Sequence, residues 1–157
     1  MLGDRKNRLF AGVVGLIFLT WLSVRLSKML AREPKNLGVR DSQLSACPDS
    51  PNCVSSQAVD QRHAIAPLLF SGDGQVALEK IHKVLQGWPG VRIINQVPGY
   101  LHAEFTSTLF RFVDDVEFVV VPNEGVVHFR SCSRVGYSDL GANRHRMESL
   151  RKKLSDL

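Results

Sequence analysis

Two cysteines close together suggest the most definite chemistry in this chain. Cys47 and Cys53 enclose the segment CPDSPNC, and five intervening residues permit a small disulfide loop where the compartment is oxidising. In a reducing compartment the pair would instead be free structural thiols. Zinc binding is a third alternative, although two cysteines at this spacing lack the second ligand pair of a structural zinc site. A disulfide would hold the polar residues Asn52, Ser55 and Ser56 in place.

The third cysteine, Cys132, lies in the sequence RSCSRVG. A cysteine nucleophile needs a base beside it, and the sequence pairs none of the five histidines with this residue. His102 and His128 alternate with apolar residues and are expected at solvated strand positions. We therefore interpret Cys132 as a small residue packed at the end of a strand, not as a catalytic group.

The densest polar segment is RSCSRVGYSDLGANRHR, residues 130–146. A junction from strand through loop to helix presents free backbone N–H groups, and arginine forks suit carboxylates or phosphates. Such a loop could bind an anion or a lipid headgroup, although the glycine and lysine spacing of a phosphate loop is absent. The interpretation that we favour for the arginines is structural: Arg130 and Arg134 would pair with acidic residues and lock the loop. The nearest acidic candidates in the sequence are Asp114, Asp115 and Asp139.

Asp114 and Asp115 form a carboxylate pair that could serve acid–base chemistry or a metal ion. Adjacent residues on a strand point to opposite faces, so the two side chains would not converge on one site. A tight turn, or a role as charge partners of the arginines, is the favoured interpretation. The chain also lacks a serine-hydrolase elbow, a dinucleotide fingerprint and an HExxH helix. We therefore predict no catalytic residue, no metal site and no cofactor.

Hydropathy patterns predict the elements that must position these residues. Helices are expected over residues 73–86 and from Leu140 to the C-terminus, because apolar residues there recur at helical spacing. Strands are expected at residues 91–97, 100–108, 116–121 and 126–131, with an irregular edge strand at 64–70. A phase shift in the alternation indicates a bulge near Thr108. Short turns between sequential strands predict an antiparallel sheet. The domain is therefore expected to be α+β, with a sheet of about five strands and two covering helices.

The N-terminal segment contains a charge-free run, LFAGVVGLIFLTWLSV, at residues 9–24. As a helix this run would span about 24 Å, against a bilayer core of about 30 Å. Basic residues precede and follow it, and Trp21 suits a membrane interface. We predict an N-terminal transmembrane helix that serves as an uncleaved anchor. Of the two alternatives, a cleaved signal peptide lacks a small-x-small site after Val24, and the flanking charges oppose a buried core helix.

Charge is divided unevenly along the chain. The first 35 residues hold seven Lys or Arg and two acidic residues, whereas the remaining residues hold thirteen of each kind. The net charge of +5 therefore belongs to the N-terminal segment, and no nucleic-acid partner is indicated. We divide the chain into a basic N-terminus with the anchor helix (residues 1–32), a tether (33–45) and a globular α+β domain (46–157).

Four sequence motifs resemble those of the bacterial domain-of-unknown-function family 1499. They are CPDSPNCVSS, HAIAPLLF, FVDDVEF and RSCSRVGYSDLGANRHRMESLR, and the resemblance covers nearly all of residues 46–157. The resemblance implies an exported or membrane-anchored protein and brings no enzymatic activity with it. This chain departs from the lipoprotein members in having a hydrophobic anchor, and Cys132 stands where a small residue is expected. The motif positions that carry over are Asn52, Ser55, Ser56, Asp114, Asp115, Arg130, Ser131, Ser133, Arg134, Gly136, Asp139, Gly141, Asn143 and Arg144.

Two arguments about the orientation of the anchor oppose each other. More basic residues follow the apolar run than precede it, which favours a cytoplasmic domain by the positive-inside rule. A disulfide between Cys47 and Cys53, together with the family resemblance, favours the non-cytoplasmic side. We give the second argument more weight and expect a single-pass membrane protein whose C-terminal domain lies outside the cytoplasm.

Two functional hypotheses follow. The first is a non-enzymatic, membrane-anchored accessory domain of the cell envelope that binds a partner protein or an anionic ligand through residues 130–146. The second is an unrecognised enzyme with a site built on the same Arg/Ser/Asp-rich loop. They differ in whether the polar groups are saturated by internal partners or face an open pocket. The candidate ligand-binding residues are Asn52, Ser55, Ser56, Asp114, Asp115, Arg130, Ser131, Ser133, Arg134, Asp139, Asn143 and Arg144.

Overall fold

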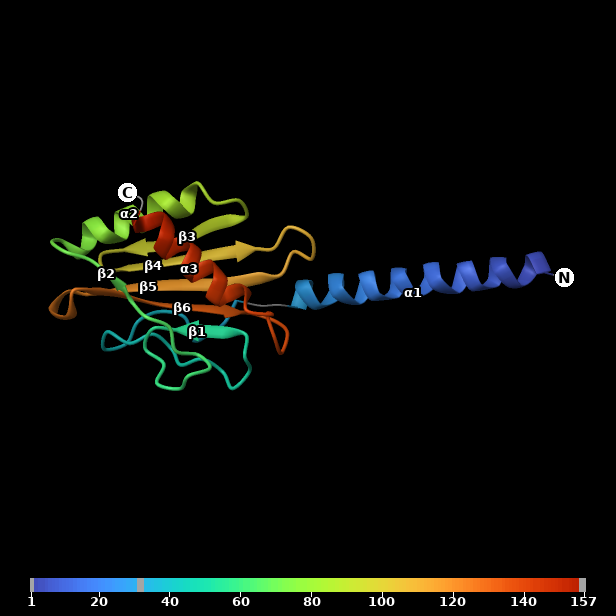
Figure 1. Ribbon diagram of the computed structural model, residues 1–157, viewed down its shortest axis with the longest axis horizontal. Helices are drawn as coiled ribbons and strands as arrows, with labels where there is room; N and C mark the ends of the chain where they lie inside the picture. Colours follow the sequence, from blue (N-terminus) through green and yellow to red (C-terminus); the bar gives the residue numbers. More distant parts are fainter. Residues whose placement is uncertain (1, 31–32, 156–157) are drawn as a thin grey trace. The chain divides into compact units, whose positions relative to one another are not determined.

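The computed structural model describes residues 2–30 and 33–155, and the chain divides into two compact units, residues 1–32 and 33–157. The first unit is one helix, α1 (Leu2–Leu30), which contains the whole apolar run (Figure 1). The predicted helix is therefore confirmed. Within the described residues, however, no helix is both long enough and apolar enough to cross a membrane.

The second unit is an antiparallel sheet with two helices on one face, so the predicted α+β class is confirmed (Figure 1). Its strands are β1 (Cys53–Ser55), β2 (Leu68–Leu69), β3 (Val91–Val97), β4 (Tyr100–Thr106), β5 (Val113–Val121) and β6 (Val126–Ser133). The order across the sheet is β1-β6-β5-β4-β3, and β2 also pairs with β6. The sheet has six strands instead of about five, because β1 is too short to show an alternating pattern.

The two covering helices are α2 (Gly74–Gln86) and α3 (Ala142–Ser155). The Asp73 carboxylate accepts a hydrogen bond from the backbone N–H of Gln75 at 2.8 Å, which caps α2. Asp139 does the same for α3 by accepting from the backbone N–H of Asn143 at 2.8 Å. Leu140, expected inside the last helix, lies before it with φ 54° and is 97% exposed. α3 begins at Ala142, two residues after Leu140, because the carboxylate of Asp139 caps the helix by accepting from the backbone N–H of Asn143.

The connection between β4 and β5 is a hairpin loop, not the bulge that was expected near Thr108. β4 ends at Thr106, residues 107–112 form the loop, and β5 begins at Val113. Arg111 adopts φ 60° in this loop, and Phe110 is half exposed at its tip. The phase shift in the alternation of apolar and polar residues near Thr108 therefore reflects the loop residues and not a bulge within a strand. The aspartates at positions 114 and 115 therefore belong to β5 and not to a turn.

The buried apolar core lies between the helices and one face of the sheet. Leu101 of β4 and Phe118 of β5 pack here with Phe129 of β6. α2 contributes residues at helical spacing, including Leu78, and α3 contributes Met147. All five side chains are completely buried. The core is formed entirely within the second unit, which can therefore bury its apolar surface without α1.

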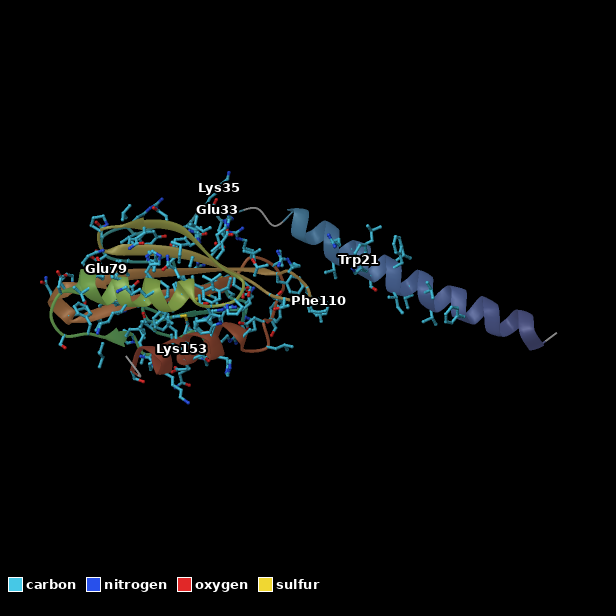
Figure 2. All side chains as sticks on the ribbon, turned by 90° about the horizontal axis from the view of Figure 1, so that it is seen from above. Trp21, Glu33, Lys35, Glu79, Phe110 and Lys153 are labelled. Atoms are coloured by element: carbon cyan, nitrogen blue, oxygen red, sulfur yellow. A yellow bond between two sulfur atoms is a disulfide. The ribbon has the colours of Figure 1, made fainter. Side chains whose placement is uncertain are left out.

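The opposite face of the sheet is polar and is covered by the beginning of the domain, residues 33–47, here named the covering segment. The backbone N–H of Gly38 donates to Oε1 of Glu117 on β5 at 2.6 Å. Leu44 is 7% exposed. Figure 2 shows Lys35 on the side of the sheet away from the helices. Residues that we expected to form a polar tether thus pack on the sheet.

Candidate functional site

A cluster of charged side chains lies buried on the covered face of the sheet. Strand alternation places every second residue of β4, β5 and β6 on this face, and the strand register makes Glu104 a neighbour of Asp115, and Glu117 a neighbour of Arg130. We name this cluster the ionic network. Its members are Arg92, Tyr100, His102, Glu104, Asp115, Glu117, Arg130 and Arg134.

Arg134 is the centre of the first half of the ionic network. Its Nε donates to Oδ2 of Asp115 at 2.8 Å, and its Nη2 donates to Oδ1 of Asp115 at 2.7 Å and to Glu104 Oε1 at 2.5 Å. Nε2 of His102 lies 2.9 Å from Asp115 Oδ1, and Arg92 binds Glu104 from the surface at 2.7 Å. Each carboxylate therefore has hydrogen-bonding partners on two sides, and Arg134 is shared by both.

These contacts change the acidity of the groups involved. Burial by itself would raise the pKa of Asp115, but hydrogen bonds from Arg134 and His102 outweigh it and hold that pKa below its ordinary value. Burial and the hydrogen bonds from Arg92 and Arg134 compete in the same way at Glu104, and its pKa is also lowered. The hydrogen bond to Asp115 raises the pKa of Arg134. Asp115, Glu104 and Arg134 are therefore ionised at neutral pH.

Arg130 and Glu117 form the second half, with looser geometry. Nη1 of Arg130 is 3.5 Å from Oε2 of Glu117, and the side chains are 4% and 0% exposed. Oε1 of Glu117 accepts hydrogen bonds from Tyr100 Oη at 2.8 Å and from the covering segment. Oε2 of Glu117 and Nε of Arg130 have no hydrogen-bond partner among the described residues. Burial, followed by the charge of Glu117, raises the pKa of Tyr100.

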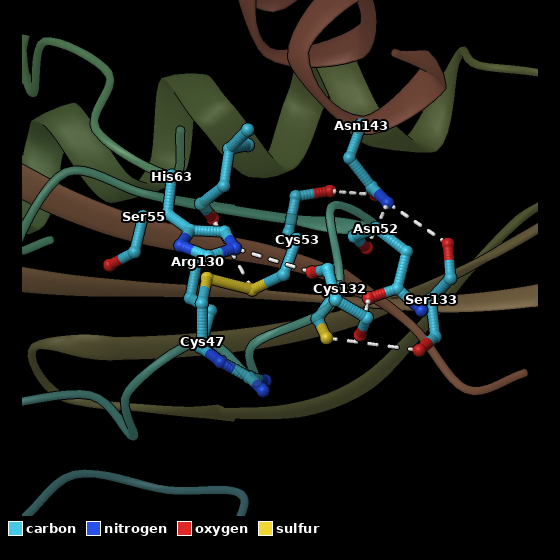
Figure 3. Close-up of a disulfide and its surroundings, with 12 residues drawn as sticks. Cys47, Asn52, Cys53, Ser55, His63, Arg130, Cys132, Ser133 and Asn143 are labelled. Atoms are coloured by element: carbon cyan, nitrogen blue, oxygen red, sulfur yellow. Dashed lines mark hydrogen bonds between the residues drawn. A yellow bond between two sulfur atoms is a disulfide. The ribbon is translucent and has the colours of Figure 1, made fainter. Parts of the chain in front are cut away.

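A second polar cluster, on the helix-covered face, is organised by Asn143 at the start of α3. Its Nδ2 donates to the backbone oxygen of Asn52 at 2.9 Å and to Ser133 Oγ at 3.0 Å, while its Oδ1 accepts from Ser131 Oγ at 2.6 Å (Figure 3). Asn143 is fully buried. The amide therefore ties β6, α3 and the loop before β1 together, and all its hydrogen bonds are internal.

Arg146 completes this second cluster. Its Nη2 donates to Oδ2 of Asp114 at 2.5 Å, and its guanidinium lies 4.6 Å from the centre of the Phe105 ring. Asp114 and Asp115, although adjacent, thus point to opposite faces of the sheet and bind different arginines, as the strand argument predicted. Arg146 was not among the predicted residues, although it lies in the polar segment. Its position one turn into α3 aims it back at the sheet.

The disulfide between Cys47 and Cys53 is present, with a Cα–Cα distance of 5.7 Å. It fastens the end of the covering segment to β1, and Arg130 and His63 lie beside it (Figure 3). Cys132 is a free, buried thiol whose pKa is raised by burial. The predicted disulfide is confirmed, and Cys132 is a free thiol packed near the end of β6, as expected. Asn52, within the loop, donates from Nδ2 to the backbone oxygen of Gly136 at 2.6 Å.

Three further predicted residues lie apart from both clusters. Ser56 accepts a hydrogen bond from the backbone N–H of Phe129 at 2.8 Å, and Ser55 accepts one from Gln57 at 3.2 Å. Arg144 donates to the backbone oxygen of Ala64 at 2.9 Å. These three side chains hold loops in place. The structure therefore divides the predicted site residues between two faces and several loops and does not gather them around one cavity.

The sequence argument missed five members of the ionic network. They are Arg92, Tyr100, His102, Glu104 and Glu117. His102 was expected at a solvated strand position, but it is 3% exposed and bonded to a buried carboxylate. The sequence signal for this face is a polar residue at alternate positions of β4, from Tyr100 to Thr106, followed by Asp115 and Glu117 on β5. That pattern is also typical of a solvated face, so it could not reveal the covering segment.

The exposed part of residues 130–146 is the loop between β6 and α3. Tyr137 is 74% exposed and Leu140 is 97% exposed, whereas the arginines point inward. The backbone N–H of Arg134 donates to the oxygen of Val113 at 3.1 Å, so this loop leaves the sheet at the same end as the loop that carries Phe110 (Figure 1). Across the described ranges, no group of His, Cys, Asp and Glu side chains could hold a metal ion.

Comparison with known proteins identifies a family and no individual relative. Searches of curated proteins and of solved structures found no match. A family model described as "Protein of unknown function (DUF1499)" matches residues 43–154. The matched range contains both polar clusters and the disulfide, and it covers most of the chain. The chain therefore belongs to the DUF1499 family, as its four motifs predicted.

Proposed function

We propose that this protein is a non-enzymatic accessory domain of the cell envelope, attached to the membrane by α1, that binds a partner protein through the exposed tip of residues 130–146. One observation carries the proposal: the charged groups of this segment are used by internal pairs, while its large apolar and aromatic side chains face solvent. Arg130, Arg134 and Arg146 each lie against a buried carboxylate. They are therefore poorly placed to bind an external anion.

The loop tip, residues 136–140, has the properties of a protein-binding surface. Tyr137 offers a large, rigid, amphipathic ring, and tyrosine is enriched among residues that dominate interface energies. The backbone of Leu140 is left-handed, and Asp139 accepts a hydrogen bond from the backbone N–H of the residue after Leu140, so the backbone has little conformational entropy left to lose on binding. The hydrogen bond from Asn52 to Gly136 fixes the other end of the tip. A preformed, exposed tip favours a protein partner over the anionic ligand of the original hypothesis.

The enzyme alternative lacks a comparable observation. Cys132 is buried and its raised pKa disfavours the thiolate form that a nucleophile requires. The pair of His102 and Asp115 has the form of a catalytic dyad, but both side chains are almost completely buried. Assay of the purified protein against ester, amide and phosphate substrates checks this alternative, and turnover abolished by His102→Ala would support it.

Membrane attachment is supported by the side chains of α1. Its middle exposes large apolar residues, among them Phe10, Leu16 and Phe18. Thr20 donates its hydroxyl to the backbone oxygen of Ile17 at 2.8 Å, so this polar group is satisfied within the helix, as an apolar medium demands. The guanidinium of Arg25 lies 4.7 Å from the centre of the Trp21 ring, and the pair would suit a membrane interface.

The disulfide supports placing the domain on the non-cytoplasmic side, because such bonds persist in oxidising compartments. A single cysteine introduced at the exposed Ser42, in a chain whose Cys132 is replaced by Ser, is the test. We expect a membrane-impermeant thiol reagent to label it in intact cells. Labelling only after lysis would reverse the orientation. Recovery of the chain in the aqueous fraction without detergent would refute the anchor while leaving the loop proposal open.

Site-specific photocrosslinking in cells tests the binding surface. A photoreactive residue at Tyr137 should give a discrete crosslinked product of one partner. The matched control is Leu69, which is 82% exposed. Leu69 lies on β2 and pairs with Val126 at the start of β6, whereas the loop tip follows the end of β6. Tyr137→Ala should abolish co-purification of the same partner in mild detergent without changing the Tm. Equal crosslinking from Leu69 and Tyr137 would contradict a specific surface.

A further inference from the structure

A groove of about 660 Å³ opens between the C-terminal ends of α2 and α3, and none of its lining residues belongs to the loop tip or to either polar cluster. Its apolar lining is Val84, Trp88 and Pro89, and its charged lining is Lys80, Lys83 and Lys153. The volume falls within the range of sites that hold small organic ligands. Lysine and apolar surface alternate here with no acidic residue in the lining.

Trp88 is held firmly as one wall of the groove. Its ring packs edge-on against Phe105 of β4, with 5.7 Å between ring centres and an interplanar angle of 78°. Its backbone N–H donates to the oxygen of Leu85 at the end of α2. Nζ of Lys153 lies 5.4 Å from the centre of the indole ring. The half-buried ring is therefore anchored in the core and still lines the groove.

No carboxylate among the described residues neutralises the three lysine charges of the groove. All three side chains are exposed, and none forms an ion pair with another described residue. Lys83 and Lys153 lie in the last turns of their helices, where a cation interacts favourably with the helix dipole. Lys80 lies one turn earlier than Lys83, so the two like charges repel each other on one helix face. An anion between them would relieve this repulsion.

We propose that this groove binds a single amphiphilic anion: an acyl or aryl group that carries one phosphate or carboxylate. The anionic group would lie between the ammonium groups of Lys80, Lys83 and Lys153, and the apolar group would pack on Trp88 and Val84. Binding needs both parts, because inorganic anions alone leave the apolar surface exposed and neutral chains leave the three charges unpaired. The proposal is independent of the protein-binding loop.

Fluorescence of Trp88 provides the test, in the full-length chain carrying Trp21→Phe so that Trp88 is the only tryptophan. The chain is kept in a constant concentration of neutral detergent and titrated with hexyl phosphate. We expect a saturable change in emission, with an apparent Kd about tenfold or more below those of 1-hexanol and of inorganic phosphate. Equal affinity for hexanol, or for phosphate alone, would refute an amphiphilic site.

A triple variant with Lys80→Gln, Lys83→Gln and Lys153→Gln tests the charged lining. We expect it to weaken hexyl phosphate binding by about tenfold or more and to leave the Tm unchanged, because the three side chains are exposed. The control is Lys152→Gln, an exposed neighbour outside the groove, which should bind as the parent does. Unchanged binding by the triple variant overturns the proposal. So does a response to vesicles containing phosphatidylglycerol without any response to hexyl phosphate, since the occupant would then be a membrane surface.

Discussion

Arg130 and Glu117 face each other across β5 and β6 with 3.5 Å between the nearest charged atoms, and each keeps one polar atom without a hydrogen-bond partner among the described residues. The strand register makes them direct neighbours. The covering segment excludes solvent, and the disulfide that fastens it ends beside Arg130 (Figure 3). Attraction between the two charges therefore has to offset the desolvation of both.

Neutralising one residue of this pair should lower the free energy of unfolding more than neutralising both residues. We expect Arg130→Met to lower the free energy of unfolding by about 3–5 kcal/mol, because it leaves the Glu117 carboxylate buried without a counter-charge. Arg130→Met combined with Glu117→Gln should recover most of that loss, since a glutamine oxygen can still accept from Tyr100 and Gly38. Urea unfolding of the three proteins measures this. A double variant no more stable than Arg130→Met would contradict the argument.

Two arginines bind Glu104, and only the buried one should matter for stability. Arg134 is 9% exposed and also binds Asp115 with two hydrogen bonds, whereas Arg92 is 72% exposed. We expect Arg134→Ala to cost about 3–5 kcal/mol and Arg92→Ala about 0–1 kcal/mol. At about 4 °C per kcal/mol, Arg134→Ala would lower the Tm by roughly 12–20 °C. Similar melting temperatures for the two variants would show that the ionic network does not stabilise the fold.

The lowered pKa values of Asp115 and Glu104 predict loss of stability in acid. Unfolded carboxyls take up protons near their ordinary pKa values of 3.8 and 4.5, while the folded ones resist protonation to lower pH. The unfolded state then binds more protons, so stability is complete above about pH 4.5 and falls as the pH drops through this range. Urea unfolding between about pH 2.5 and 6.5 measures the slope. Asp115→Asn should reduce it, and an equal slope in that variant would exclude the network as its source.

The three cysteines should differ sharply in reactivity. The folded protein should give no thiol labelling at neutral pH, because Cys132 is buried with a raised pKa and the other two are bonded to each other. Denaturant should expose one thiol, and denaturant with reductant should expose three. Reduction alone should cost about 2 kcal/mol, as expected for a short closed loop. Two thiols labelled without reductant would show that the disulfide is absent in solution.

Local signals in the sequence were sufficient for much of the fold. Apolar residues at helical spacing identified α2 and α3, and alternation with turn residues identified β3, β4 and most of β5 and β6. Cysteine spacing made the disulfide one of three alternatives, because a short closed loop permits the bond, and the structure shows the bond formed. β2 lies inside the edge strand expected at residues 64–70 but is only two residues long. β1 escaped detection, since a strand of three residues is too short to show a period and depends on its pairing with β6.

The partners of the charged residues depended on tertiary structure. The sequence placed Arg134 near Asp115 because the motif residues are close along the chain, but Glu104 and Glu117 became partners through strand register. The covering segment then turned a face that reads as solvated into a buried one. Periodicity reports which residues share a face, whereas burial of that face depends on what packs over it. Burial of the polar face was decided by residues 33–47, which show neither helical nor strand periodicity, and by the disulfide that fastens them to β1.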